Sequence, residues 1–278
     1  MKISYQLRAL SLLALFCGGA STPLFATVSA ASASVAPLPA LVQDDELPDE
    51  REDIEERIDQ FKKHIKKRGD EDREAIGLVD ELLTEFPGCG PKDREDIVKD
   101  LAKGLDVKRK EVDGAPDNRL FLAISTALGE MGPESAGPLA KYIGHKRLKN
   151  DLAVQRRLIL SLGKTKVESG VKTLVGLLNH KDATLIGASA EALANHDELA
   201  LKKRKDVFED LLKSLMSHKA AVDADVNDII AKERYDVVAA PIITTLKRLS
   251  KHDDARTPED WQRWWNKNKR SDWDSLDD

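Results

Sequence analysis

The sequence LGEMGPES at residues 128–135 returns as LGKTKVES at residues 162–169, so that Leu-Gly and Glu-Ser both recur at the same offset. A looser third copy is Leu193-Ala194-Asn195, and a second dipeptide recurs as His145-Lys146, His180-Lys181 and His218-Lys219. Apart from the looser copy, the offsets are about 34 to 38 residues. They are too long for a heptad and too short for a domain, and they are typical of helix pairs that stack into solenoids. We therefore expect the Leu-Gly and His-Lys signals to mark where helices end in a repeat array.

Apolar residues between these signals follow the spacing of amphipathic helices. In residues 49–68, one helical stripe is formed by Ile54, Ile58, Phe61 and Ile65. The same periodicity predicts four helix pairs, at 76–86 with 97–105, 118–130 with 133–143, 154–162 with 167–178, and 183–193 with 202–215, the helix at 183 being capped by Asp182. The segment 92–105 also matches 202–215 without gaps, at Asp96, Asp100, Leu101, Lys103 and Leu105 against Asp206, Asp210, Leu211, Lys213 and Leu215.

The end of the chain departs from this pattern. Residues 220–228 are polar, and in residues 229–249 Pro241 must either kink one helix or separate two; we expect it to separate a final, atypical pair. Farther on, Thr257-Pro258-Glu259-Asp260 combines a capping residue, a proline and an acid three residues after the cap, which predicts a helix start. On that helix three tryptophans share one side, and a fourth follows: Trp261, Trp264, Trp265 and Trp273.

The first thirty residues are typical of an export signal. Lys2 and Arg8 precede a short apolar core at 9–16, and small residues follow at 28–33. About eight apolar residues are too few to span a bilayer. We therefore predict a signal peptide at 1–30, a tether at 31–47 and a periplasmic or extracellular location. Lipid attachment at Cys17 is a second interpretation, and it is disfavoured because the bulky Phe16 stands where a small residue is needed.

The composition describes a charged helical protein. Of its 278 residues, 41% are hydrophobic, 33% are charged and 5% are aromatic. Loss of a leader containing Lys2 and Arg8 would change the formal net charge from −5 to −7, and an acidic body argues against nucleic acid as a partner. No stretch after the leader reaches the roughly 18 apolar residues of a membrane-spanning helix. Basic groups such as those at 62–63, 66–68, 108–110 and 202–205 alternate with acids, which favours solvated helix faces over a phosphate site.

Taken together, these features resemble the HEAT-repeat family, in particular exported bacterial HEAT-like proteins that end in a tryptophan-rich tail. The resemblance covers residues 70–273 and is carried by the helix ends at 127–129 and 161–163, the repeated apolar pairs to Leu215, and residues 261–265. It implies an all-α, armadillo-like α-solenoid of about five helical pairs with atypical terminal caps. The array would occupy 48–250, and a cap with an acidic tail would occupy 251–278. Such proteins usually offer a concave helical face to another protein.

Residues that carry chemistry form no recognisable constellation. The sequence lacks a nucleophile elbow, a phosphate loop and paired metal-ligand spacing, so we predict no catalytic, cofactor-binding or metal-binding residues. His145, His180 and His218 recur on neighbouring repeats, but packed helices lie ~8–10 Å apart, whereas zinc needs several donors at ~2.0–2.3 Å. We interpret them as polar turn residues. The leader aside, Cys89 is the only cysteine; it lies in a Pro-Gly turn with no base nearby in sequence, which favours an inert or dimer-forming thiol over a catalytic one.

The favoured function is a non-enzymatic, exported scaffold that binds a protein partner through the second helices of the pairs, near Lys141, Lys172 and Lys213. A second hypothesis assigns carbohydrate or envelope-surface binding to Trp261, Trp264 and Trp265; as a structural cap, these tryptophans would instead cover the apolar residues Ile242, Leu246 and Leu249. We favour the cap. A third hypothesis is an unrecognised HEAT-like enzyme.

Overall fold

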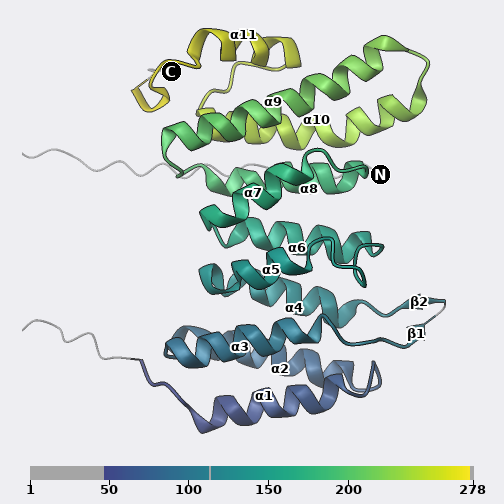
Figure 1. Ribbon diagram of the computed structural model, residues 1–278, viewed down its shortest axis with the longest axis vertical. Coiled ribbons are helices and arrows are strands. Elements are labelled where there is room, and N and C mark those ends of the chain that lie inside the picture. The colour runs from purple at the N-terminus through teal and green to yellow at the C-terminus, as the bar shows by residue number, and fades with distance from the viewer. Residues whose placement is uncertain (1–46, 113, 276–278) are drawn as a thin grey trace, which may run out of the picture. The chain divides into compact units, whose positions relative to one another are not determined.

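The fold is all-α, as predicted. A computed structural model describes residues 47–112 and 114–275, which form eleven α-helices (Figure 1). They are α1 (Glu52–Ile65), α2 (Asp72–Glu85), α3 (Pro91–Gly104), α4 (Arg119–Glu130), α5 (Ala136–Tyr142), α6 (Leu152–Lys164), α7 (Glu168–Leu177), α8 (Ala183–Leu193), α9 (Leu201–Ala224), α10 (Ile229–Ser250) and α11 (Pro258–Asn268). Four 3₁₀ turns accompany them, at Phe86–Gly88, Gly132–Ser135, Ala194–His196 and Trp273–Ser275. The predicted signal peptide, Cys17 and nearly all of the predicted tether lie outside the described residues.

A small antiparallel hairpin interrupts the connection between α3 and α4. It consists of β1 (Glu111–Val112) and β2 (Ala115–Pro116), which pair Glu111 with Pro116. This hairpin was not predicted from the sequence. None of the helices in residues 47–112 and 114–275 combines the length and the apolar character that crossing a membrane requires.

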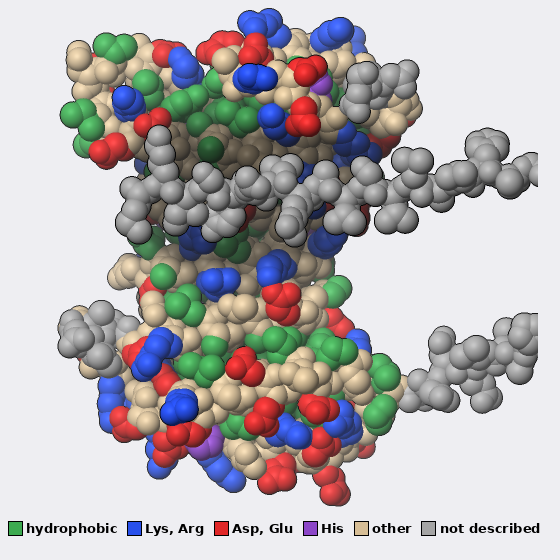
Figure 2. Space-filling view, turned by 180° about the vertical axis from the view of Figure 1, so that it is seen from behind, with side chains coloured by type: hydrophobic (Ala, Val, Ile, Leu, Met, Phe, Trp, Pro, Cys, Tyr) green, Lys and Arg blue, Asp and Glu red, His purple; other side chains and the backbone are tan. Residues whose placement is uncertain are grey.

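The helices pack in two rows. The even row consists of α2, α4, α6, α8 and α10, each in contact with the next, and the odd row consists of α3, α5, α7, α9 and α11, also in successive contact. Helix α1 contacts both α2 and α3. A single cluster of buried apolar side chains runs from Ile54 to Trp273 through the two rows. The surface seen in Figure 2 mixes basic and acidic side chains over most of its described area.

The repeated glycine explains how successive even-row helices approach each other. Gly129 and Gly163 lie in the last turns of α4 and α6, at the helix ends that the sequence predicted. A Cβ atom at Gly163 would lie 2.7 Å from Cα, Cβ and O of Ala192 in α8, and one at Gly129 would lie 2.8 Å from Cβ of Ser161 in α6. Carbon atoms normally pack at about 3.5–4.0 Å. The repeated glycine therefore marks a close contact between successive even-row helices as well as the end of a helix.

Helix α10 corrects one prediction. It runs through Pro241 without a break, so the expected division into two helices is wrong. An interior proline removes one helical hydrogen bond, here to the carbonyl of Val237. Contacts with α8 support the helix at this point, because a Cβ on Gly187 would lie 3.4 Å from that carbonyl and 3.5 Å from Cγ of Pro241. The Thr245 hydroxyl also lies 2.7 Å from the carbonyl oxygen of Ala190 in α8.

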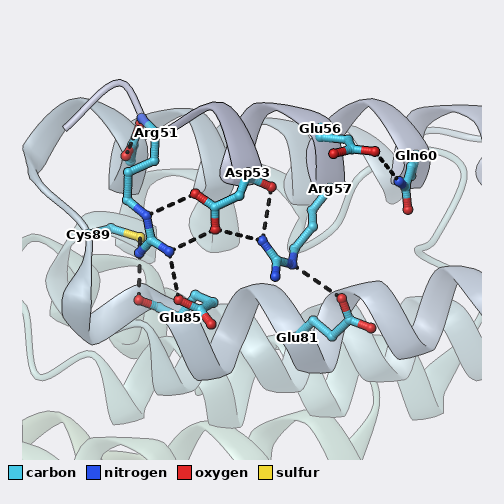
Figure 3. A network of polar contacts seen from close by, with 9 residues as sticks. Arg51, Asp53, Glu56, Arg57, Gln60, Glu81, Glu85 and Cys89 are labelled. Carbon is cyan, nitrogen blue, oxygen red and sulfur yellow. Dashed lines mark hydrogen bonds and ion pairs between the residues drawn. The ribbon is translucent and has the colours of Figure 1, made fainter. Parts of the chain in front are cut away.

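The N-terminal end of the core is closed by α1, whose four predicted stripe residues are all buried. A network of ion pairs also joins the start of α1 to α2 (Figure 3). The guanidinium of Arg51 lies 2.8 Å from Asp53 and 2.9 Å from Glu85, and that of Arg57 lies 2.8 Å from Asp53 and 3.3 Å from Glu81. Hydrogen bonds to Asp53 and Glu85 raise the pKa of Arg51. These contacts fix α1 against α2 at its first two turns.

A buried ion pair holds the segment that follows α3. The side chains of Asp72 and Arg109 are in contact, with only 4% and 1% of their area exposed. The Arg109 guanidinium also lies 5.7 Å from the ring centre of Phe121 in α4. The basic group at 108–110 is therefore divided, because its central residue is internal while Lys108 and Lys110 are exposed.

Both predicted helix caps are confirmed. The Asp182 carboxylate accepts a hydrogen bond from the Thr184 amide at 2.9 Å at the start of α8. At the start of α11, the Thr257 hydroxyl accepts from the Asp260 amide at 3.1 Å, and the Asp260 carboxylate accepts from the Thr257 amide at 3.0 Å. This reciprocal capping box fixes the first turn of the tryptophan-bearing helix.

Candidate partner-binding surface

The three lysines suggested by the sequence lie on consecutive helices of the odd row. Lys141 is in α5, Lys172 in α7 and Lys213 in α9, and all three are exposed. The ammonium group of Lys141 lies 5.2 Å from the ring centre of Tyr142. That of Lys213 lies 3.1 Å from the Glu209 carboxylate. Because α5 contacts α7 and α7 contacts α9, this row offers one continuous series of helices that display these side chains.

A cleft of about 260 Å³ lies between α7 and α9. Its walls come from Val175, Leu178 and Asn179 on one side and Asp210, Lys213, Ser214 and Ser217 on the other. Burial raises the pKa of Asp210, although Lys213, 3.9 Å away, acts in the opposite direction. Lys213 thus lines a depression in the odd row.

A larger groove, of about 710 Å³, lies between α1 and α3. Twelve of its fourteen lining residues are ionisable. Toward the end of the groove formed by Lys62 and Lys103, the Asp100 carboxylate, 8% exposed, lies 2.5 Å from the ammonium group of Lys103 and 3.2 Å from that of Lys62. Burial raises the pKa of Asp100, but the hydrogen bonds from these two lysines outweigh it, and the pKa lies below its ordinary value. The groove therefore keeps its carboxylate charged.

The two depressions are built from equivalent residues. Asp100 and Lys103 in α3 correspond to Asp210 and Lys213 in α9 in the ungapped match between these helices. In both places the aspartate and the lysine three residues later line a cleft toward the neighbouring helix. In the sequence alone, this match indicates only that the segment is repeated. The shared charged pair was the signal that could have identified the two clefts.

The tryptophan cluster is organised around Phe208 of α9. The ring centre of Phe208 lies between 5.2 and 5.8 Å from those of all four tryptophans. Trp261 is fully buried and Trp273 is 2% exposed, whereas Trp264 and Trp265 are half-buried. Helix α11 contacts α9, so the tail covers α9, which precedes α11 in the odd row. Phe208 was absent from the sequence-based prediction of what the tryptophans cover.

A cleft of about 620 Å³ lies beside this cluster. Its lining includes Trp264, Trp273 and His252 together with polar residues such as Lys267 and Asn268. The rings of His252 and Trp264 are stacked, with centres 5.3 Å apart and planes at 18°. The Trp273 indole donates to the carbonyl of Asn268 at 3.0 Å. Of the tryptophans suggested as binding residues, Trp264 lines this cleft and Trp261 is wholly internal.

The repeated histidines have unrelated surroundings. His145 packs edge-on against Tyr142 with ring centres 5.5 Å apart, His180 accepts a hydrogen bond from the Asp182 amide at 3.0 Å, and burial lowers the pKa of His218. Within residues 47–112 and 114–275, no three side chains from His, Cys, Asp and Glu are grouped so as to hold a metal ion.

Cys89 lies in the turn between α2 and α3 and is fully buried. Its Sγ atom donates to the carbonyl of Glu85 at 3.3 Å, and the Arg51 Nη1 atom lies 3.8 Å away (Figure 3). Burial raises the pKa of the thiol, which disfavours the reactive thiolate.

Comparisons with protein-family models, with curated proteins and with solved structures find no match to this chain. The HEAT-like family therefore remains a prediction from the residues quoted above. The structure shows an all-helical protein, and its eleven described helices contact their neighbours in two rows.

Proposed function

We propose that this protein is a HEAT-like α-solenoid that serves as a non-enzymatic, exported adaptor, and that it binds another protein through the exposed side of the odd row. Two features support the solenoid. The sequence repeats at about 34 to 38 residues, as helix-pair arrays do. In addition, α4 meets α6 at Gly129 and α6 meets α8 at Gly163, so a glycine recurs at equivalent contacts of the even row.

The observation that carries the proposed binding surface is the repeated aspartate–lysine pair. Asp100 with Lys103 and Asp210 with Lys213 line clefts at two separate places in the same row. The row between them exposes Lys141 and Lys172. A partner that spans several repeats would meet charged groups at regular intervals, and such an arrangement sets register and orientation.

The composition of the larger groove favours a protein over a small molecule. Pockets for small ligands are lined mainly by apolar and aromatic side chains. The α1–α3 groove has only Ile54 and Ile58 as apolar lining residues. A surface of paired opposite charges is better matched by the polar rim and interspersed charges of a protein interface.

Site-specific photocrosslinking in cells tests this proposal. A photoreactive residue would replace Lys99 in α3 or Lys172 in α7. As a control, it would replace Arg157 in the even-row helix α6. All three side chains are exposed, and Lys172 and Arg157 have no ion-pair partner among the described residues. The two odd-row positions should crosslink to the same protein species, and the α6 position should not. Crosslinks that favour α6, or none from the odd row, would refute the proposed surface.

A second candidate function is binding of an envelope carbohydrate at the cleft beside Trp264. It is favoured by one observation, that an aromatic wall and polar groups from His252, Lys267 and Asn268 meet in a space of about 620 Å³. Sugar sites commonly combine an aromatic face with such polar groups.

Deletion of residues 257–278 discriminates the two roles of the tail. If α11 acts as a cap, the deletion exposes Phe208 and lowers the stability of the whole array. If the tail is a binding module, the rest of the fold keeps its denaturation midpoint and only binding to polysaccharide is lost. Circular dichroism during denaturation, combined with cosedimentation with polysaccharide, separates these outcomes.

A further inference from the structure

The hairpin formed by α9 and α10 extends beyond the body of the two rows. These helices have 24 and 22 residues, whereas the other nine have 14 or fewer. The hairpin tip is at the upper right in Figure 1. No residue from Met216 to Val237 is buried. Arg234 ties this part of α10 to the loop before α8, because its guanidinium donates to the carbonyls of His180 and Lys181 at 2.8 and 2.7 Å.

The tip of this hairpin is apolar and uncovered by other described residues. Val226, Ile229 and Ile230 are 79%, 70% and 78% exposed, and they are the three most exposed large hydrophobic residues in residues 47–112 and 114–275. Apolar side chains gather at this end of the hairpin, at the upper left in Figure 2. Contiguous apolar patches on a protein surface commonly mark interaction sites.

The rim of the tip is acidic. Residues 222–231 contain Asp223, Asp225 and Asp228 but neither lysine nor arginine. Asp223 pairs with Lys219 at 2.5 Å. The carboxylates of Asp225 and Asp228 accept only local backbone hydrogen bonds, at 2.9 and 3.0 Å, and have no ion-pair partner among the described residues. The matching surface must therefore be an apolar depression with a basic border.

Such a depression exists on the same chain, at the C-terminal end of α1. It measures about 240 Å³ and is lined by Ile65, Lys66, Arg68, Val107 and Lys108. None of its three basic side chains has an ion-pair partner in the part of the chain that the structure describes. The adjoining residues 62–68 contain five basic residues and no acid. Its floor is thus apolar and its border is positively charged.

We propose that the α9–α10 tip of one copy docks into the basic-rimmed pocket at the end of α1 of a second copy. Apolar side chains of the tip would meet Ile65 and Val107, while Asp225 and Asp228 would face the free basic groups. Two different surfaces form this contact, so the association is head-to-tail and can propagate into a chain or close into a ring. This inference does not depend on the proposed adaptor function.

The same charges argue against other occupants. Two tips placed against each other would bring aspartates together, and an anionic lipid surface would repel the acidic rim. The tip can bury only a small area compared with the ~800 Å² of surface that each partner buries in a stable interface. The association is therefore weak, and it weakens further in about 1 M salt, where charges are screened within ~3 Å.

Two double variants test the proposal by sedimentation velocity of the purified full chain over a range of concentrations. Ile229→Ser/Ile230→Ser alters the tip, and Lys66→Glu/Lys108→Glu alters the pocket. All four residues are exposed, so the fold should tolerate the changes. The matched control for the pocket variant is Lys146→Glu/Lys149→Glu, which changes the net charge by the same amount on the exposed loop before α6.

We expect the unaltered protein and the control to self-associate in low salt, and each double variant alone to bind about tenfold or more weakly. A mixture of the two variants should form a heterodimer that grows no further, because each variant retains one intact surface. A monomeric unaltered protein at all concentrations would overturn the proposal. So would a mixture that stays monomeric, or binding to anionic vesicles that depends on Ile229 and Ile230. The photocrosslinking test of the adaptor function gives an independent result, since its positions lie in neither the α9–α10 tip nor the pocket at the end of α1.

Discussion

Substitution of Gly163 by alanine tests the packing of the even row. The new methyl group would lie 2.7 Å from Cα, Cβ and the carbonyl oxygen of Ala192 in α8. Two of these atoms belong to the backbone, so a side-chain rotation cannot remove the overlap. Helices α6 and α8 would have to move apart, and the apolar contacts between them would loosen. Gly176 in α7 is the matched control, because a Cβ there meets nothing within 4 Å.

The two substitutions should change stability in opposite directions. Alanine is favoured over glycine inside a helix by about 0.5–1 kcal/mol, which is the whole effect expected for Gly176→Ala. At Gly163 overpacking costs roughly 1–3 kcal/mol, and contact with backbone atoms places the cost in the upper part of that range. We expect a net loss of about 1–2 kcal/mol, and a difference between the variants of about 2–3 kcal/mol.

Equilibrium denaturation in urea, followed by circular dichroism, measures both changes. The midpoint should fall for Gly163→Ala and rise for Gly176→Ala, with little change in slope. If Gly163→Ala matches or exceeds the unaltered protein in stability, then α6 and α8 are not in the close contact described above. The role assigned to the repeated glycine would then be refuted.

Three further changes probe other parts of the core. Asp72→Ala leaves the Arg109 guanidinium buried without its carboxylate, so the free energy of unfolding measured by urea denaturation should fall by about 3–5 kcal/mol. A loss below about 1 kcal/mol, as for exposed ion pairs, would contradict the burial of this pair. Burial lowers the pKa of His196, whose ring nitrogens have no hydrogen-bond partner among the described residues, so the folded state favours the neutral ring. The free energy of unfolding should therefore decrease as pH falls below about 6.5, and His196→Leu should reduce this slope to the part that His218 contributes; an unchanged slope would count against the assignment. Trp261→Ala should lower stability by about 3–5 kcal/mol in thermal denaturation, and a small effect would contradict the complete burial of this side chain against Phe208.

Local patterns predicted the helices well. The stripe from Ile54 to Ile65 is buried in α1 because residues three and four apart share one helix face. The caps at Asp182 and Thr257 were predictable because a capping side chain bonds to an amide only two or three residues away. These features depend on neighbours in sequence, so the sequence displays them directly.

Tertiary contacts decided the features that the sequence did not predict. Pro241 stays within α10 because it packs beside Gly187, which is 54 residues earlier in the chain. Arg109 belongs to an apparently solvated basic group, yet Asp72 and Phe121 surround it. The apolar side chains at 226–230 were obscured by the polar residues between them, and only the end of the hairpin brings them together.

The helices that carry the candidate lysines were predicted from the sequence. Lys141, Lys172 and Lys213 do lie on successive odd-row helices, because the apolar periodicity placed each of them in the second helix of a pair. The groove between α1 and α3 was not predicted, since its walls meet across about forty residues of sequence. The same separation hid the pairing of Asp100 with Lys62, which needs α1 to lie against α3.

The most direct test of the proposed binding surface is hydrogen exchange of the protein with and without the partner that the crosslinks identify. The odd row should become protected, with slower exchange in α3, α5, α7 and α9 and little change in α4, α6 and α8. Matched exchange at these two sets of helices, or protection confined to the even row, would contradict the claim that this protein binds its partner through the odd row.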